Sequence, residues 1–349
     1  MKPLHWNNSG SRFEAMIGVG GVGSGMFFLL NGSHTLGREE SRSGHFLEKN
    51  DYCKLHIISH YVKALLGPDF HVIPIARVGN DDVGRRLTME MKEIGMATSH
   101  LAVDPERHTL FSFCFLYPDR SGGNMTTDDS ACSALSALSV TEAESLFQQF
   151  AGKAIALAAP EVPLEAREAL LDLATAYGCF RVASFTSEEL RDSKTQSMLR
   201  KVDLLCVNLE EAASVLDTTV RDGASRAVAE AAIKSLFALN PAMQVSITVG
   251  KEGSYVWDGS TMTFTPARSV EVVSTAGAGD AFTGGLIAGK VVGLSLVEAQ
   301  ELATLVGACS VTSPHTINKD LDQDSLRLLI ERPNSSVSTN VLTLLMEKQ

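Results

Sequence analysis

Short apolar runs rich in β-branched residues alternate along this chain with longer stretches that have the pattern of amphipathic helices. The predicted strands are residues 15–19, 71–77, 109–117, 153–158, 179–185, 203–207 and 244–249. The predicted helices are residues 83–94, 164–177, 187–200, 224–239 and 295–312. This alternation predicts an α/β fold of right-handed βαβ units, with a mainly parallel sheet and helices on both faces. Ligands of such sheets bind at the carboxyl ends of the strands.

The composition of the chain argues against some classes of binding partner. The chain has 349 residues, of which 44% are hydrophobic, so it can build a sizeable core. A net charge of -11 argues against nucleic acid as the main partner, although local dipoles can still bind a small anion. We expect no membrane span and, because the six cysteines form no CxxC pair, a reduced cytoplasmic setting.

Two glycine-rich segments imitate nucleotide-binding motifs. Gly18, Gly20 and Gly23 fit the GxGxxG pattern of nicotinamide enzymes, but residues 24–32 are too short and too rich in glycine for the crossover helix. A tight turn after the first strand is the favoured interpretation. Residues 284–290 match GxxxxGK, yet they lie inside a helical pattern and precede Val291 instead of Ser or Thr. Their small residues predict close packing of a buried helix against the sheet.

A third segment, STAGAGDAFTGG at residues 274–285, carries the functional prediction. Residues 271–273 can end a strand, 275–279 form a turn, and 281–292 can form a helix. The first amides of a helix have no intrahelical acceptor, so Gly277, Ala278 and Gly279 can bind a phosphoryl group. Asp280 can then accept the proton of an attacking hydroxyl, which indicates phosphoryl transfer to an alcohol. The alternative is that Asp280 only caps the helix.

The segment Thr275 to Asp280 resembles the T-x-G-A-G-D signature of the ribokinase-like (PfkB) family of carbohydrate kinases. Similar matches occur in family order at residues 78–84, 207–211, 246–253 and 310–314. The resemblance implies a ribokinase-like kinase domain over residues 13–330, with a small β lid inserted at about 35–47 and 109–127. Residues 331–349 would form a C-terminal tail or terminal helix.

The resemblance also implies cofactors and roles. Asp280 would be the catalytic base and the amides of Gly277, Ala278 and Gly279 the anion hole. The expected cofactors are ATP and Mg²⁺, with Glu211 holding the metal indirectly. The residues expected to contact the nucleotide and its phosphates are Asn208, Glu211, Thr248, Gly250, Gly253 and Thr275. Glu211 could instead only charge a helix terminus, and the two glycines could form a plain turn.

Other positions depart from the family pattern. Ser274 replaces the first Asp of the signature, near a monovalent-cation site, which leaves the use of such a cation open. Gly25 falls where the family has a sugar-binding Asp, and residues 47–60, where the first large helix begins, lack its glycine pair. The polar residues offered for a different substrate are Asn50, Asp51, Lys54 and His56, with Arg38 or Arg42 on the lid. Lys54 and the arginines could hold a sugar acid or sugar phosphate, or they could be solvated charges.

We therefore expect ATP-dependent phosphorylation of a hydroxyl on a small sugar, sugar derivative or nucleoside. His315 and Asn318 are candidates for lining the nucleotide pocket, and the lid is a candidate dimer face. Two alternatives stay open at this stage. One is a non-catalytic ligand sensor on the same fold, and the other is an NAD-dependent oxidoreductase.

Overall fold

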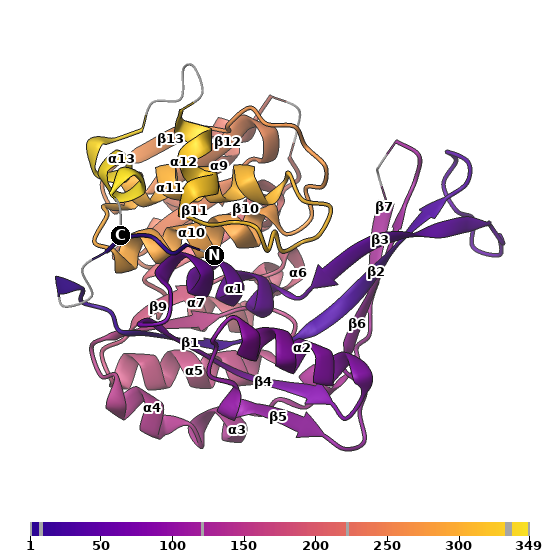
Figure 1. Cartoon of the computed structure of the whole chain (residues 1–349), viewed down its shortest axis with the longest axis horizontal. Helices are drawn as coiled ribbons and strands as arrows, with labels where there is room; N and C mark the ends of the chain where they lie inside the picture. The colour runs from indigo at the N-terminus through magenta and orange to yellow at the C-terminus, as the bar shows by residue number, and fades with distance from the viewer. Residues whose placement is uncertain (1, 7–9, 120–121, 221–222, 332–336, 348–349) are drawn as a thin grey trace.

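A computed structural model describes residues 2–6, 10–119, 122–220, 223–331 and 337–347 of the chain. Within this part of the chain, nine strands form the central sheet: β1 Ala15–Val19, β4 His71–Gly79, β5 Leu101–Asp104, β8 Ala154–Ala158, β9 Phe180–Ala183, β10 Leu204–Asn208, β11 Gln244–Thr248, β12 Gly253–Trp257 and β13 Met262–Pro266. Their spatial order is β13-β12-β11-β10-β9-β8-β1-β4-β5 (Figure 1). Among these strands the β11–β12 and β12–β13 pairs are antiparallel and the other six pairs are parallel, so the sheet is mainly parallel as predicted.

Helices cover both faces of this sheet. One face carries α1 Lys54–Leu66, α2 Asp82–Glu93, α10 Ala278–Val291, α11 Leu296–Ser310, α12 Gln323–Ile330 and α13 Thr339–Met346. The other carries α3 Ala137–Thr141, α4 Glu144–Gln149, α5 Leu164–Ala176, α6 Ser187–Arg191, α7 Ser193–Leu199, α8 Leu209–Ser214 and α9 Ser225–Leu239. Alternate side chains of β1 enter the two cores: Met16 packs in the first, and Ile17 in the second. None of the described helices is long and apolar enough to cross a bilayer.

The glycines of α10 permit close packing against two other helices. A Cβ built on Gly284 would lie 2.8 Å from the Cβ of Tyr61 in α1. One built on Gly285 would lie 2.7 Å from the Cα of Ala303 in α11. Because real Cβ atoms do not approach so closely, these glycines do serve close packing of a buried helix, but at Gly284 and Gly285 the partners are α1 and α11 and not the predicted sheet.

A second, four-stranded sheet projects from one edge of the molecule (Figure 1). It contains β2 Gly23–Leu30, β3 Gly44–Tyr52, β6 Leu110–Leu116 and β7 Gly122–Thr126, in the order β3-β2-β6-β7. We call this sheet the lid. Strand β2 follows the tight turn predicted after β1, and β3 runs beyond residue 47 as far as Tyr52. Asn50 and Asp51 are therefore strand residues, and α1 begins only at Lys54.

Two predicted elements were wrong. Residues 271–273 do not end a strand, because the chain is irregular from residue 267 to 277 and the Val273 N–H donates to the Val311 carbonyl at 2.8 Å. The helix predicted over residues 187–200 is broken at Asp192, which has extended backbone angles. The Asp192 carboxylate accepts a hydrogen bond from the Lys194 N–H, so it caps a second helix instead of continuing the first.

Candidate active site

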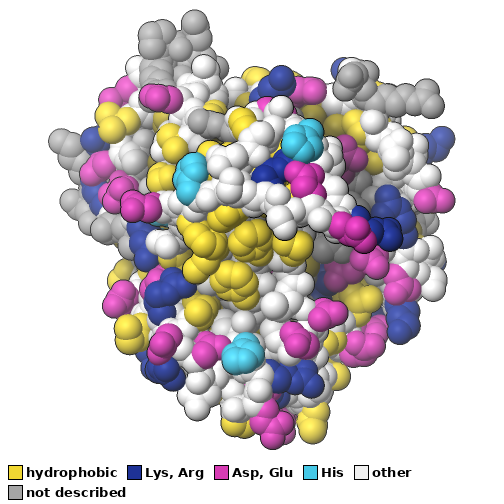
Figure 2. Space-filling model, turned by 90° about the vertical axis from the view of Figure 1, so that its right-hand side faces the viewer, with side chains coloured by type: hydrophobic (Ala, Val, Ile, Leu, Met, Phe, Trp, Pro, Cys, Tyr) yellow, Lys and Arg dark blue, Asp and Glu magenta, His cyan; other side chains and the backbone are white. Residues whose placement is uncertain are grey.

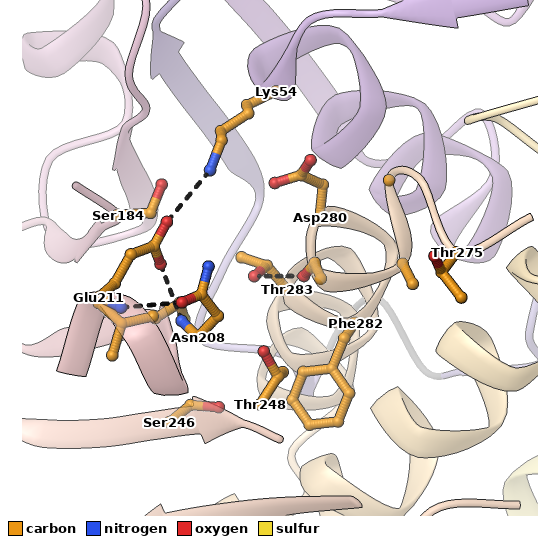
Figure 3. A pocket seen from close by; sticks show the side chains of 15 residues that line it. Lys54, Ser184, Asn208, Glu211, Ser246, Thr248, Thr275, Asp280, Phe282 and Thr283 are labelled. Carbon is orange, nitrogen blue, oxygen red and sulfur yellow. Dashed lines mark hydrogen bonds and ion pairs between the residues drawn. The ribbon is translucent and has the colours of Figure 1, made fainter. Parts of the chain in front are cut away.

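A cavity of about 200 Å³ lies at the carboxyl ends of β10 and β11, beside the start of α10 (Figure 3). Its lining comes from distant parts of the chain, with Lys54 from α1, Asn208 and Glu211 from the β10–α8 junction, and Asp280 from α10. The carboxyl ends of parallel strands are where α/β proteins bind ligands. The structure thus brings together, in one cavity, residues predicted to bind substrate, cofactor and the reacting hydroxyl.

The glycine loop forms one wall of the cavity. Gly277 is the N-cap of α10 and has φ 78°, and a Cβ there would lie 2.7 Å from the Thr316 carbonyl oxygen. Glycine is therefore required by both the left-handed conformation and the lack of space. Gly279 faces open space, since the nearest atom to a Cβ built there is Thr248 Oγ1 at 4.0 Å. The Ala278 N–H is turned toward the Thr275 carbonyl, 3.3 Å away.

Asp280 lies in the first turn of α10, and its carboxylate points into the cavity toward the side on which Lys54 lies (Figure 3). Burial raises the pKa of this carboxyl above its ordinary value, while the positive charge of Lys54 acts in the opposite direction. A carboxylate with a raised pKa is a stronger base than a solvated aspartate.

Lys54 is the first residue of α1, and its Nζ lies 3.6 Å from Glu211 Oε1. Burial alone would lower the pKa of this ammonium, but the negative charges of Asp280 and Glu211 outweigh it and raise the pKa. Lys54 is consequently a cation that the carboxylates of Asp280 and Glu211 stabilise inside the cavity.

Asn208 and Glu211 form a capping box at the start of α8. The Asn208 N–H donates to Glu211 Oε2 and the Glu211 N–H donates to Asn208 Oδ1, both at 2.8 Å. Burial raises the pKa of Glu211, and Lys54 opposes that effect. The same carboxylate thus caps a helix and lines the cavity, so the structural and the functional interpretations of Glu211 are compatible.

The donor set suits a weakly held magnesium ion. The described residues contain no group of three or more His, Cys, Asp or Glu side chains able to hold a metal. Mg²⁺ commonly binds through one or two carboxylates while keeping several waters and substrate phosphates as ligands. Glu211 can supply one such carboxylate, because its Oε1 atom faces the side of the cavity on which Lys54 lies.

The other residues predicted to contact the nucleotide do not all line the cavity. Thr248 and Thr275 line the cavity. Gly250, with φ 51°, and Gly253, with φ 135°, form the turn between β11 and β12 and do not line it. A Cβ on Gly253 would overlap the Thr265 carbonyl oxygen, so this glycine has a structural requirement of its own.

The residues predicted to bind the substrate also lie in different parts of the structure. Arg38 lies on the exposed loop between β2 and β3, where Arg42 pairs with Glu40. The Asn50 N–H donates to His315 Nδ1 at 2.9 Å, and both residues line a second cavity of about 260 Å³. Asn318 also lines this second cavity.

Glu161 is a further acidic residue near the site that the sequence patterns did not single out. It follows the carboxyl end of β8 with φ 74°, an uncommon conformation for a residue other than glycine. Its Oε2 accepts the Lys54 N–H at 3.1 Å, and burial raises its pKa to about 7. The sequence feature that could have identified Glu161 is its position shortly after a buried parallel strand, where the functional residues of α/β sheets lie.

The matching family model identifies the class of protein. It is described as the pfkB family carbohydrate kinase and covers residues 62–324, so the chain belongs to this family. The protein is therefore a carbohydrate kinase, a phosphotransferase, and the alternative of an NAD-dependent oxidoreductase is wrong.

Particular relatives agree with this class. A 2-dehydro-3-deoxygluconokinase of Bacillus subtilis (strain 168) is 41% identical over 71 residues, which span 20% of this chain and only 22% of that protein. A ribokinase of Cryptococcus neoformans, solved with ADP, has a TM-score of 0.75 at 19% identity and covers 90% of this chain and 99% of its own. A ribokinase of Arabidopsis thaliana, solved with ribose and ATP, has a TM-score of 0.72 at 16% identity, over 92% of this chain and 99% of its own. These structures share the ribokinase-like fold.

Proposed function

We propose that the protein transfers the γ-phosphoryl group of ATP to a hydroxyl of a small sugar or sugar derivative, with Asp280 as the catalytic base. One observation carries this proposal: Asp280, Lys54 and the glycine loop of residues 277–279 converge on a single cavity at the carboxyl ends of β10 and β11. Phosphoryl transfer to an alcohol uses a base and a glycine loop at a helix N-terminus, and a cation beside them can bind an anionic acceptor.

Each group has a separate task in this mechanism. The Asp280 carboxylate takes the proton of the acceptor hydroxyl as the hydroxyl oxygen attacks the γ-phosphorus, and the bond from that phosphorus to the bridging oxygen breaks to release ADP. The Gly277 and Gly279 amides, at the positive end of the α10 dipole, stabilise negative charge on the phosphoryl oxygens. Glu211 would hold Mg²⁺ through water, and that ion would neutralise charge on the triphosphate. The nucleotide would extend past Thr248 and Thr275 toward the turn of Gly250 and Gly253.

The acceptor we favour is a sugar acid. Lys54 places a positive charge between Asp280 and Glu211, within reach of a substrate carboxylate. The similarity to a 2-dehydro-3-deoxygluconokinase supports the same class. Neutral sugars and nucleosides are the competing acceptors. If the acceptor is one of these neutral molecules, Lys54 would instead stabilise negative charge on the transferred phosphoryl group.

A transfer assay tests the proposal. Purified wild type and Asp280→Asn would be incubated with ATP and Mg²⁺ and a panel of sugar acids, neutral sugars, sugar phosphates and nucleosides, and phosphorylated products measured by mass spectrometry. We expect wild type to phosphorylate at least one sugar acid, and the variant to lose about 10²- to 10⁴-fold in kcat for it. Equal activity of the two proteins would exclude Asp280 as the base. No product from wild type, with ligand binding retained, would favour the sensor function.

A further inference from the structure

Residues 313–318, which follow α11, lie between the base of the lid and the start of α10. We call them the connecting loop. Their backbone forms bends instead of a helix or strand, yet Thr316, Ile317 and Asn318 are 2%, 1% and 8% exposed. Because a buried loop must satisfy its backbone polar groups within the protein, its hydrogen bonds show which elements hold it in place.

One side of the connecting loop is bonded to the end of β3, the edge strand of the lid. The Thr316 N–H donates to the Asn50 carbonyl at 3.1 Å, and the Tyr52 N–H donates to Thr316 Oγ1 at 3.0 Å. The Asn50 N–H donates to His315 Nδ1 at 2.9 Å. The loop thus takes the place that a further strand would have beside β3, and the Thr316 hydroxyl supplies one of its hydrogen bonds.

The Thr316 hydroxyl has a second partner in the Asp51 carboxylate. Burial raises the pKa of Asp51 to about 6, and the hydrogen bond from Thr316 opposes that rise. The hydroxyl therefore accepts from Tyr52 and donates to Asp51, which it can do because it is a donor as well as an acceptor. Its position is consequently fixed by two neighbouring residues of the lid.

The other side of the connecting loop packs against the glycine loop. A Cβ built on Gly277 would lie 2.7 Å from the Thr316 carbonyl oxygen and 3.0 Å from the Thr316 Cβ. Gly277 is the N-cap of α10, and its left-handed backbone sets the direction of the amides of residues 277–279. Because two backbones are in contact here, a displacement of Thr316 would displace Gly277 and turn these amides.

The far end of the connecting loop has anchors of its own. The Asn318 N–H donates to the Tyr61 hydroxyl at 2.8 Å, and Asn318 Nδ2 donates to the Cys309 carbonyl at 2.9 Å. These bonds hold the loop to α1 and α11 without the Thr316 hydroxyl. Removing that hydroxyl should therefore loosen Thr316 while the rest of the loop stays in place.

We propose that Thr316 is a positioning residue for phosphoryl transfer: its hydroxyl fixes it on β3, and its backbone then holds Gly277 so that the glycine-loop amides point at the transferred group. Thr316 itself does not line the active-site cavity, so it acts only through Gly277. This role rests on the proposed kinase function and adds a residue that supports its anion hole. An amide stabilises developing charge only when it points at the oxygen that carries the charge, so a small rotation lowers kcat.

Substitutions that differ by the hydroxyl give the first test. Transfer to the best acceptor of the panel would be measured for wild type, Thr316→Ser, Thr316→Val and Thr316→Ala. We expect Thr316→Val and Thr316→Ala to lower kcat roughly 10- to 100-fold at a KM for ATP within about twofold of wild type, and Thr316→Ser to keep most of the activity. Thr195→Val in α7 removes a hydroxyl that is just as deeply buried, on the opposite face of the sheet, and as the matched control it should change neither constant.

Binding of a transition-state mimic separates positioning from a general loss of structure. ADP with aluminium fluoride imitates the phosphoryl group during transfer, whereas ADP alone does not. With acceptor and Mg²⁺ present, we expect Thr316→Val to weaken binding of the mimic by about the same factor as kcat and to leave binding of ADP unchanged. A merely structural role would weaken both equally, and that result would overturn the proposal.

The transfer assay also separates this proposal from the proposed function. Thermal melting would show which variants are folded, and Thr316→Ala replaces Thr316→Val if valine does not fit the site. If the folded variants without the hydroxyl transfer as fast as wild type, while Asp280→Asn is slow, the role of Thr316 is wrong and the kinase mechanism stands. If wild type phosphorylates no acceptor, the proposed function itself has failed.

Discussion

At the residue scale, the charges around Lys54 explain why this site could be predicted only in part. Glu211 and Asp280 were singled out because each lies in a recognisable motif, whereas Lys54 was one of several polar residues in a segment, 47–60, that departs from the family pattern. Glu161 was missed because its side chain reaches Lys54 through a left-handed backbone turn after β8, which no residue pattern encodes. A further contact was also not predictable: Gly25 leaves room for the Asp51 carboxylate, which depends on which residue of β3 lies opposite.

The charge of Lys54 should control the pH dependence of transfer. Lys54 lowers the pKa of Asp280, which burial raises above its ordinary value, and Asp280 must be ionised to act as a base. We expect Lys54→Met to move the acidic limb of the kcat/KM profile to higher pH, because the opposing charge is lost. Lys54→Arg keeps the charge and should leave the limb closer to that of wild type. A limb that stays in place or moves to lower pH in Lys54→Met would contradict this coupling.

Glu161 should make the folded state less stable as the pH rises. Burial raises its folded-state pKa from 4.5 to about 7, so between these values the folded protein holds a proton that the unfolded chain has released. The free energy of unfolding should therefore fall from pH 4.5 to 7 by more in wild type than in Glu161→Gln. Urea denaturation of both proteins across this range measures the difference. Parallel curves would show that Glu161 does not titrate in this way.

At the element scale, most of the central sheet was predictable from the strand pattern, whereas the lid was predicted only in part: the segments expected at 35–47 and 109–127 overlap β3, β6 and β7, but β2 was missed. Parallel strands buried on both faces, such as β1 and β8, are continuous apolar runs that stand out in the sequence. Strand β2 contains glycines and β3 is mostly polar, so neither has the pattern of a buried strand. The break between α6 and α7 depends on the local conformation of Asp192 and not on hydrophobic periodicity.

The glycines of α10 give a stability prediction for helix packing. We expect Gly285→Ala to destabilise the protein by about 1–3 kcal/mol, because the added methyl would lie 2.7 Å from the Cα of Ala303. Gly307→Ala in α11 is the matched control, since the nearest atom to its added Cβ is 3.7 Å away. That change should be neutral or stabilise by up to about 1 kcal/mol. Chemical denaturation would measure both values, and equal effects would contradict the packing argument.

At the scale of the whole molecule, the active site exists only because distant segments meet at one edge of the sheet. Residues 54, 208–211 and 277–280 come from three helix starts, and βαβ topology brings them together around the cavity (Figure 3). The sequence predicted residues 208–211 and 277–280 from motifs, and residue 54 only as one of several candidate substrate residues. The distances between these residues, and the effects of their charges on one another, could be obtained only from the fold.

The outer face of the lid, which carries Met26, Phe28, Phe46, Phe113 and Met125, supports the predicted homodimer. Figure 2 views the molecule from the side on which the lid projects, and it shows hydrophobic side chains gathered near the centre of that view. On the outer face of the lid, Met26, Phe46 and Met125 are 48%, 58% and 56% exposed, and the rings of Phe28, Phe46 and Phe113 pack together. Exposed apolar patches of this kind mark interaction sites. We expect wild type to sediment as a dimer and Phe46→Ser with Met125→Ser to shift it toward monomer. A wild type that is monomeric at all concentrations would contradict this prediction.

The central claim is that Asp280 removes the proton of the acceptor hydroxyl during phosphoryl transfer. Rapid-quench measurement of a single turnover, with enzyme in excess over labelled ATP and the best acceptor saturating, isolates that step from product release. We predict that Asp280→Asn binds ATP and acceptor with affinities close to those of wild type but transfers the phosphoryl group about 10²- to 10⁴-fold more slowly. An unchanged single-turnover rate in Asp280→Asn would contradict the account.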